Sequence, residues 1–194
     1  MSNWFGDLWR AARERGAPDA RPVRIMMRGI PTVVVNTRPD IDTADVLRRL
    51  DEALGVLETH VPWHFRRLPR DFSRLEVRRY PCRGAYLPAE RACLVELTFV
   101  VNRDFTASQV ASTILHEAMH ARLHRLGFPL EMADRARQER FCRRAEIELG
   151  ERVPDGAPIL TRARASLALE DEGVAPAIDW DVAARRVREV DEGA

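Results

Sequence analysis

The longest regular pattern of hydrophobic positions runs from about residue 107 to 126 and predicts a helix. Thr106 and Gln109 have the spacing of a capping box at its start, and Gly127 follows its end as a terminating glycine. Apolar residues cover most of the helical wheel, and they are Val110, Ile114, Leu115, Ala118, Met119 and Leu123. The remaining polar wedge consists of Thr113, His116, Glu117, His120 and His124. The pattern predicts a buried central helix with one polar stripe.

A second helical pattern follows from about residue 132 to 149 and ends at Gly150. Its mostly apolar face consists of Gln138, Phe141, Cys142, Ala145 and Leu149. Glu139 and Glu146 flank this face, seven residues apart and so nearly on the same side of the helix. Either carboxylate could join the histidines of the first helix in one site.

The rest of the chain alternates between short strand patterns and helices. We predict strands at residues 23–27, 32–35 and 75–80, and a hairpin of residues 84–87 with 92–98. Helices are predicted at about residues 3–15, 43–59, 160–169 and 180–190, the last capped by Asp179. Residues 62–69 are interpreted as a connector because of their prolines. The expected organisation is an N-terminal amphipathic extension (1–20), an α+β domain (21–153) and a C-terminal helical extension packed on it (154–194).

Composition and charge exclude only a few classes of function. The 194 residues suffice for one domain with its own core. The 31 basic residues, all arginines, and the 30 acidic residues leave a formal net charge of +1. Bulk charge therefore predicts neither a nucleic-acid nor a membrane partner. Three widely spaced cysteines, no secretion signal and no long apolar run predict a cytoplasmic protein.

Two histidines of the polar wedge have the spacing of a metal-binding pair. His116 and His120 are four residues apart, so their imidazoles lie roughly 6 Å apart along the helix axis and can reach one ion. Glu117 is rotated about 100° from His116, which suits a general base for water at the ion better than a ligand. His124 lies about 12 Å along the axis from His116, too far to share that ion. The alternative interpretation is a buried helix whose histidines satisfy each other and the backbone.

The motif His116-Glu117-x-x-His120, followed by Glu139 on the next helix and a small residue at Cys142, resembles the gluzincin metallopeptidases. Within that clan it resembles the minigluzincins and the phage-immunity repressor-cleaving metallopeptidases, over roughly residues 84–150. The resemblance implies one zinc ion per chain, held by His116, His120 and Glu139, with Glu117 activating the attacking water. Glu146 is the alternative third ligand.

The resemblance also implies a zincin-like fold. Such a fold has a small twisted sheet, packed on the motif helix and on a second helix that bears the third ligand. The strand before the motif helix then lies at the sheet edge along the cleft, where an extended substrate can add as another strand. Residues 84–87 are the candidate, because glycine and alanine leave room for a substrate backbone. An ordinary hairpin is the alternative.

One position departs from the family pattern. The family residue four positions after the ligand glutamate often hydrogen-bonds a metal-binding histidine, but here it is Arg143, which has donors and no acceptor. Glu146 is a candidate for that role. A donor for the tetrahedral intermediate could be Arg143, Arg140 or Tyr86.

We therefore expect a zinc-dependent metallopeptidase, an endopeptidase acting on a specific protein or peptide. A regulatory partner protein is compatible with this expectation. Two alternatives stay open. One is a catalytically silent zinc-binding regulatory protein with a closed site of four protein ligands, including His124 through a broken helix or Glu146. The other is a non-peptidase zinc hydrolase with the same ligands and a different cleft.

Overall fold

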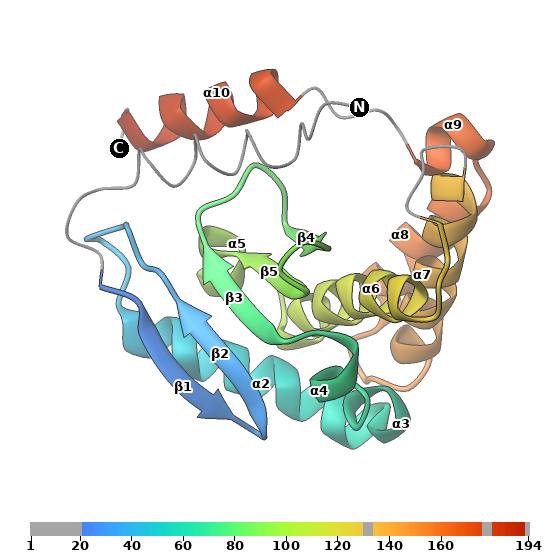
Figure 1. Cartoon of the computed structure of the whole chain (residues 1–194), viewed down its shortest axis with the longest axis horizontal. Coiled ribbons are helices and arrows are strands. Elements are labelled where there is room, and N and C mark those ends of the chain that lie inside the picture. The colour runs from blue at the N-terminus through green and yellow to red at the C-terminus, as the bar shows by residue number, and fades with distance from the viewer. Residues whose placement is uncertain (1–20, 130–133, 176–179, 193–194) are drawn as a thin grey trace.

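The computed structural model describes residues 21–129, 134–175 and 180–192. Their fold is α+β, with helices packed on and beside a small mixed sheet (Figure 1). The predicted helix at residues 3–15 and the predicted cap at Asp179 lie outside the described residues. No helix in the described ranges is long and apolar enough to cross a membrane.

The sheet has five strands in the order β1-β2-β3-β5-β4. Their bounds are β1 Val23–Met27, β2 Ile30–Val34, β3 Arg74–Arg78, β4 Gly84–Leu87 and β5 Ala92–Glu96. The two outer pairs, β1 with β2 and β4 with β5, are antiparallel, whereas β3 pairs parallel to β2 and β5. The predicted hairpin of residues 84–87 is confirmed, and its first strand is an edge of the sheet.

The helices agree with most of the predicted segments. Their bounds are α2 Thr43–His60, α3 Pro62–Phe65, α4 Leu68–Asp71, α5 Leu97–Val101, α6 Ala107–Arg125, α7 Arg135–Gly150, α8 Ala157–Leu167, α9 Asp171–Val174 and α10 Trp180–Glu192. The interpretation of residues 62–69 as a connector was wrong, because α3 and α4 form there. Each has proline in its first turn, where the missing N–H costs no hydrogen bond.

The predicted strand at residues 92–98 also ends earlier than expected. Glu96 accepts a hydrogen bond from the Phe99 backbone N–H at 2.7 Å and so caps α5. The cap satisfies a backbone donor that a continuing strand would have paired with a neighbour. The chain therefore leaves the sheet after Glu96 and enters a short helix.

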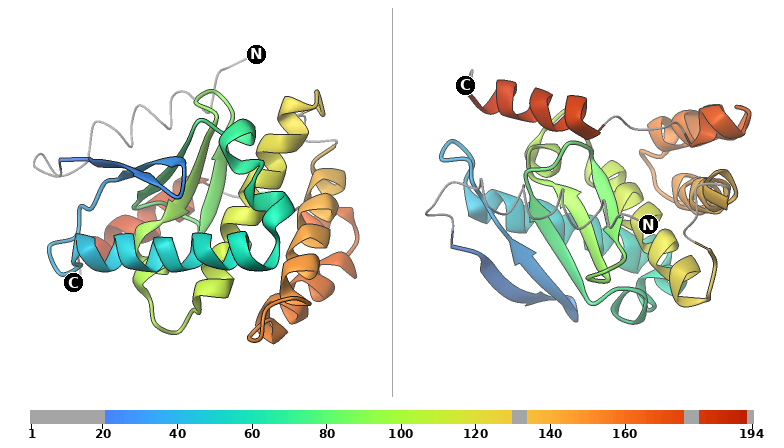
Figure 2. Two further views of the ribbon diagram at one scale, coloured as in Figure 1. Left: turned by 90° about the horizontal axis from the view of Figure 1, so that it is seen from below. Right: turned by 45° about the horizontal axis from the view of Figure 1, so that its top comes forward.

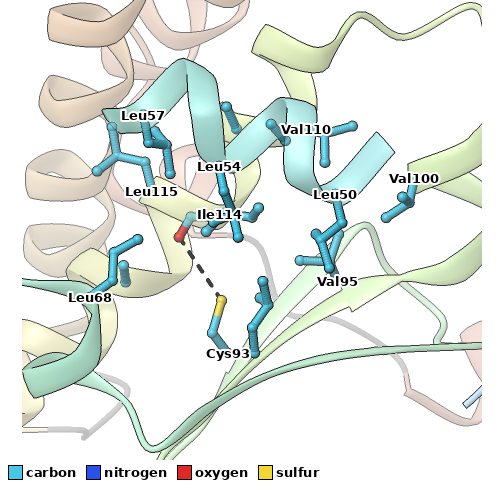
Figure 3. Close-up of a cluster of buried hydrophobic side chains, with 14 of the residues drawn as sticks. Leu50, Leu54, Leu57, Leu68, Cys93, Val95, Val100, Val110, Ile114 and Leu115 are labelled. Carbon is cyan, nitrogen blue, oxygen red and sulfur yellow. Dashed lines mark hydrogen bonds between the residues drawn. The ribbon is translucent and has the colours of Figure 1, made fainter. Parts of the chain in front are cut away.

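Helix α6 occupies the centre of the molecule. Its predicted capping box is confirmed, since Thr106 and Gln109 hydrogen-bond each other's backbone N–H groups. Figure 3 shows leucines of α2 packed against the apolar face of α6, above Cys93 and Val95 of β5. Each fully buried side chain of this kind contributes about 1.5–3 kcal/mol of transfer free energy. This packing fixes the rotation of α6 and turns its polar stripe toward β4 and α7.

Helix α7 packs between α6 and α8, on the side of α6 away from the sheet (Figure 2). Three of its buried side chains are polar, namely Gln138, Glu139 and Glu146. Two buried glutamates on one helix need partners, because an isolated buried carboxylate is costly. They find these partners on α6, on α8 and on α7 itself.

Candidate metal centre

The two histidines of the predicted pair lie side by side on α6. The Nε2 atoms of His116 and His120 are 3.2 Å apart, and their ring centroids are 5.0 Å apart. His116 is buried, with 7% of its surface exposed. Two imidazole nitrogens at this distance can both bind one proton or one cation placed between them.

The carboxylate of Glu139 on α7 faces both of these nitrogens, with a different oxygen toward each. Its Oε2 lies 3.2 Å from Nε2 of His116, and its Oε1 lies 3.3 Å from Nε2 of His120. The carboxylate is 8% exposed. The structure thus places the three residues predicted as ligands around one point, although their side chains come from two helices.

A thiol lies beside the same point. His116, His120 and Cys142 have ligand atoms that all lie within 4.8 Å of one another, and this buried group could hold a metal ion. Burial raises the pKa of the Cys142 thiol well above its ordinary value, and the charges of Glu139 and Glu117 raise it further. From the sequence, Cys142 was expected only to be a small residue near Glu139. Its position three residues after Glu139, on the same side of α7, was the signal that could have indicated a fourth donor.

Together, the ionised carboxylates around His116 outweigh the effect of burial on its pKa. Burial by itself would lower the pKa of His116, but the hydrogen bonds that its ring donates to Glu139 and Glu146 raise it to about 10. The same contacts with His116 and His120 lower the pKa of Glu139, against the effect of its burial. The pocket therefore strongly favours positive charge between the two imidazoles and the carboxylate.

The other ring nitrogen of His116 faces a different set of groups. Its Nδ1 lies 3.4 Å from Oε1 of Glu146, which is 1% exposed. Arg143 and Arg162 each donate to Glu146 at 2.8 Å. Despite burial, the hydrogen bond to His116 and the nearby positive charges lower the pKa of Glu146 to about 2. A carboxylate in this position holds the ring and leaves Nε2 free to bind an ion.

Glu117 lies on the flank of α6 that faces β4. Its carboxyl is buried, and burial raises its pKa, against the effect of the two histidines. Gly84 of β4 passes directly over this flank. A Cβ at Gly84 would lie 2.6 Å from Cγ2 of Thr113 and 3.1 Å from Glu117. Only glycine at this position lets the edge strand approach Glu117 so closely.

The three residues considered as donors for a reacting oxygen lie in different places. The Tyr86 hydroxyl is 2.9 Å from Nδ1 of His124, which links β4 to the last turn of α6. Arg143 reaches the back of the site, with its Nη1 3.5 Å from Nδ1 of His116. Arg140 instead binds the carbonyls of Leu167 and Leu169 beyond the end of α8. Arg140 therefore holds α8 in place rather than facing the histidines.

Arg162 was not anticipated from the sequence. It comes from α8, 16 residues after Glu146, and also lies 3.4 Å from the hydroxyl of Ser112. No local pattern connects α8 with the histidines, so only the packing of α8 on α7 brings this residue to the site.

No protein-family description, curated protein or solved structure matches this chain. The function has to be inferred from the residues of the metal centre themselves.

Proposed function

We propose that the chain is a zinc-dependent metallopeptidase, in which His116, His120 and Glu139 bind one zinc ion and Glu117 is the general base. The observation that carries the proposal is that the two histidine Nε2 atoms lie 3.2 Å apart and that each faces its own oxygen of the Glu139 carboxylate, at 3.2 and 3.3 Å. Tetrahedral zinc with bonds of about 2.0–2.1 Å places neighbouring ligand atoms roughly 3.3 Å apart. Two neutral histidines and one carboxylate also match a common catalytic ligand set of zinc hydrolases.

A bound zinc ion would supply Lewis acidity, polarising a carbonyl and lowering the pKa of a water molecule. The protein's part begins with Glu117, which takes a proton from the attacking water and passes it to the leaving nitrogen. The raised pKa of its buried carboxyl suits both steps, because a carboxylate whose pKa is raised accepts a proton more readily and can later give it up. Glu146 holds His116 so that its Nε2 faces the ion.

The edge strand supports a peptide as substrate. Among the described residues, strand β4 pairs with β5 alone, and it packs against α6 and carries Gly84 over Glu117. An extended peptide can add to such an edge through backbone hydrogen bonds, which would run it past the general base. A specific protein target, cytoplasmic action and a regulatory partner remain expectations from the sequence.

Elemental analysis of protein purified without added metal is the first test, run beside His116→Ala and Glu139→Ala. About one zinc per chain in the parent, sharply reduced in both variants, is expected. Glu117→Gln should keep the zinc and lose hydrolysis of an unstructured protein substrate. Loss of zinc in Glu117→Gln, or no metal in the parent after zinc is supplied, would contradict the proposal.

The proximity of Cys142 favours a second candidate, a closed zinc site with four protein ligands in a regulatory protein. Cobalt(II) substitution separates the two candidates, because a thiolate ligand gives a sulfur-to-cobalt charge-transfer band in the near ultraviolet. The peptidase proposal predicts no such band. A band that is lost in Cys142→Ala but retained in Cys93→Ala, the control at another fully buried thiol, would favour the closed site.

A further inference from the structure

Helices α3 and α4 lie near α6 in the ribbon (Figure 1). A groove lined by arginines of the α3–α4 segment and of the last turn of α6 lies there. Its volume is about 450 Å³. The residues that define this arginine groove are Trp63, Arg66, Arg67, Arg70, Arg122 and Arg125. Arg122 lies two residues after His120, about 200° around the helix, so the groove opens on another face of α6 than the metal centre.

The positive charge in the groove is largely unneutralised. Arg125 pairs with the buried carboxylate of Asp71 at 3.0 Å. Within the described residues, the exposed Arg66 and Arg70 and the partly buried Arg122 form no ion pair. Desolvation and the charge of Arg122 lower the pKa of Arg67, against the opposite effect of Asp71. A bound anion would relieve this repulsion.

An exposed aromatic ring stands in the same groove. Trp63 is 56% exposed, although large apolar side chains are usually buried. The guanidinium of Arg67 lies 3.8 Å from the ring centroid and stiffens one side of this platform. An indole beside several guanidinium groups can stack a planar base while the arginines bind phosphates.

We propose that the arginine groove binds nucleotides, with phosphate groups on Arg66, Arg70 and Arg122 and a base on Trp63. Its volume falls within the range of about 300–1,000 Å³ that is typical of small-ligand sites. A free nucleoside polyphosphate and a single-stranded nucleic acid offer the same chemistry. The net charge of +1 gave no sign of such a ligand, because it averages this groove with acidic surface elsewhere.

Fluorescence anisotropy with the full chain tests the proposal, using a labelled nucleoside triphosphate and a labelled single-stranded oligonucleotide as probes. The double variant Arg66→Gln/Arg70→Gln should weaken binding at least tenfold. Its matched control, Arg24→Gln/Arg103→Gln, removes two exposed arginines outside the groove and should leave binding within twofold of the parent. Equal losses in the two double variants, or no binding of either probe at low salt, would overturn the proposal.

Two further binding measurements identify which chemical groups of the ligand are recognised. Trp63→Ala should weaken the nucleoside triphosphate severalfold while inorganic triphosphate, measured as a competitor, is unaffected. Polyglutamate at equal charge should compete poorly, and equal competition would overturn the proposal in favour of an acidic protein segment. Because the groove is separate from the metal centre, these results do not depend on zinc or on hydrolysis.

Salt dependence distinguishes the two sources of the nucleotide. If a strand is bound, Arg66→Gln/Arg70→Gln should reduce the slope of log affinity against log salt by about 1.4, at about 0.7 per phosphate contact. If the free nucleotide is the better ligand, it should compete with the oligonucleotide at concentrations near its own dissociation constant.

Discussion

Glu139 and Glu146 stand seven residues apart on α7, and both contact His116, yet their surroundings differ sharply. Glu139 faces the Nε2 atoms of two histidines, and the Arg143 guanidinium approaches it only to 3.9 Å. Glu146 faces Nδ1 of His116 and receives two arginines at 2.8 Å. The charge of Glu139 faces the space between the imidazoles, whereas the charge of Glu146 is balanced by the two arginines.

This difference suggests which glutamate would bind a metal ion. A carboxylate held by two guanidinium groups has little charge and few lone pairs left to offer. Glu146 is suited to orient His116, and Glu139 is suited to join it as a ligand. Two residues of one type thus have different roles because their partners on α6, α7 and α8 differ.

The largest expected effect is on zinc affinity after loss of the carboxylate that faces both histidines. Glu139→Ala should weaken zinc binding by more than the roughly 100-fold limit for partners that only support a ligand. Competition with a chelating indicator of known affinity measures this change. If Glu146→Ala weakens zinc binding more than Glu139→Ala, the two roles are exchanged.

A smaller loss is expected on the other side of His116. Glu146→Gln should lower zinc affinity by about 10- to 100-fold, because the imidazole loses a charged acceptor that orients it. Glu148→Gln, a partly exposed position on the same helix, is the control and should bind zinc like the parent. An unchanged affinity in Glu146→Gln would show that His116 needs no such acceptor.

The smallest effect, counted per pH unit, is the pH dependence of zinc binding. Without an ion, hydrogen bonds to Glu139 and Glu146 raise the pKa of His116 to about 10, so the ring is protonated at pH 7. Zinc binds the neutral ring, and affinity should therefore rise about tenfold per pH unit between pH 7 and 9. Calorimetry in buffers of different ionisation enthalpy should detect about one proton released per zinc. Glu146→Gln lowers this pKa, so its affinity should depend less on pH.

The elements that carry the site could be predicted because their signals are local. The capping box of Thr106 and Gln109 and the periodicity after it defined α6 closely, and the turn between residues 87 and 92 defined the edge hairpin. The α+β class followed from the same patterns. By contrast, α3 and α4 were missed, because two prolines at helix starts look the same in sequence as two prolines in a connector.

Contacts between distant segments could not be predicted. Arg162 reaches Glu146 only because α8 packs along α7, and Cys142 approaches the histidines only at the particular rotation of α7. The arginine groove joins residues near 63–70 with residues near 122–125, which no local pattern relates. These features depend on how apolar faces meet, and many alternative packings share the same periodicity.

Because the proposed ligands lie on both α6 and α7, a bound ion would also cross-link these two helices. An ion bound by His120 and Glu139 would close a loop of 19 residues (139 − 120), much as a disulfide does. The entropy removed from the unfolded chain by closing a loop of about this length corresponds to roughly 3 kcal/mol. A chelator would then open the loop as well as disable the chemistry, so the protein's melting temperature would report directly on the zinc available to it.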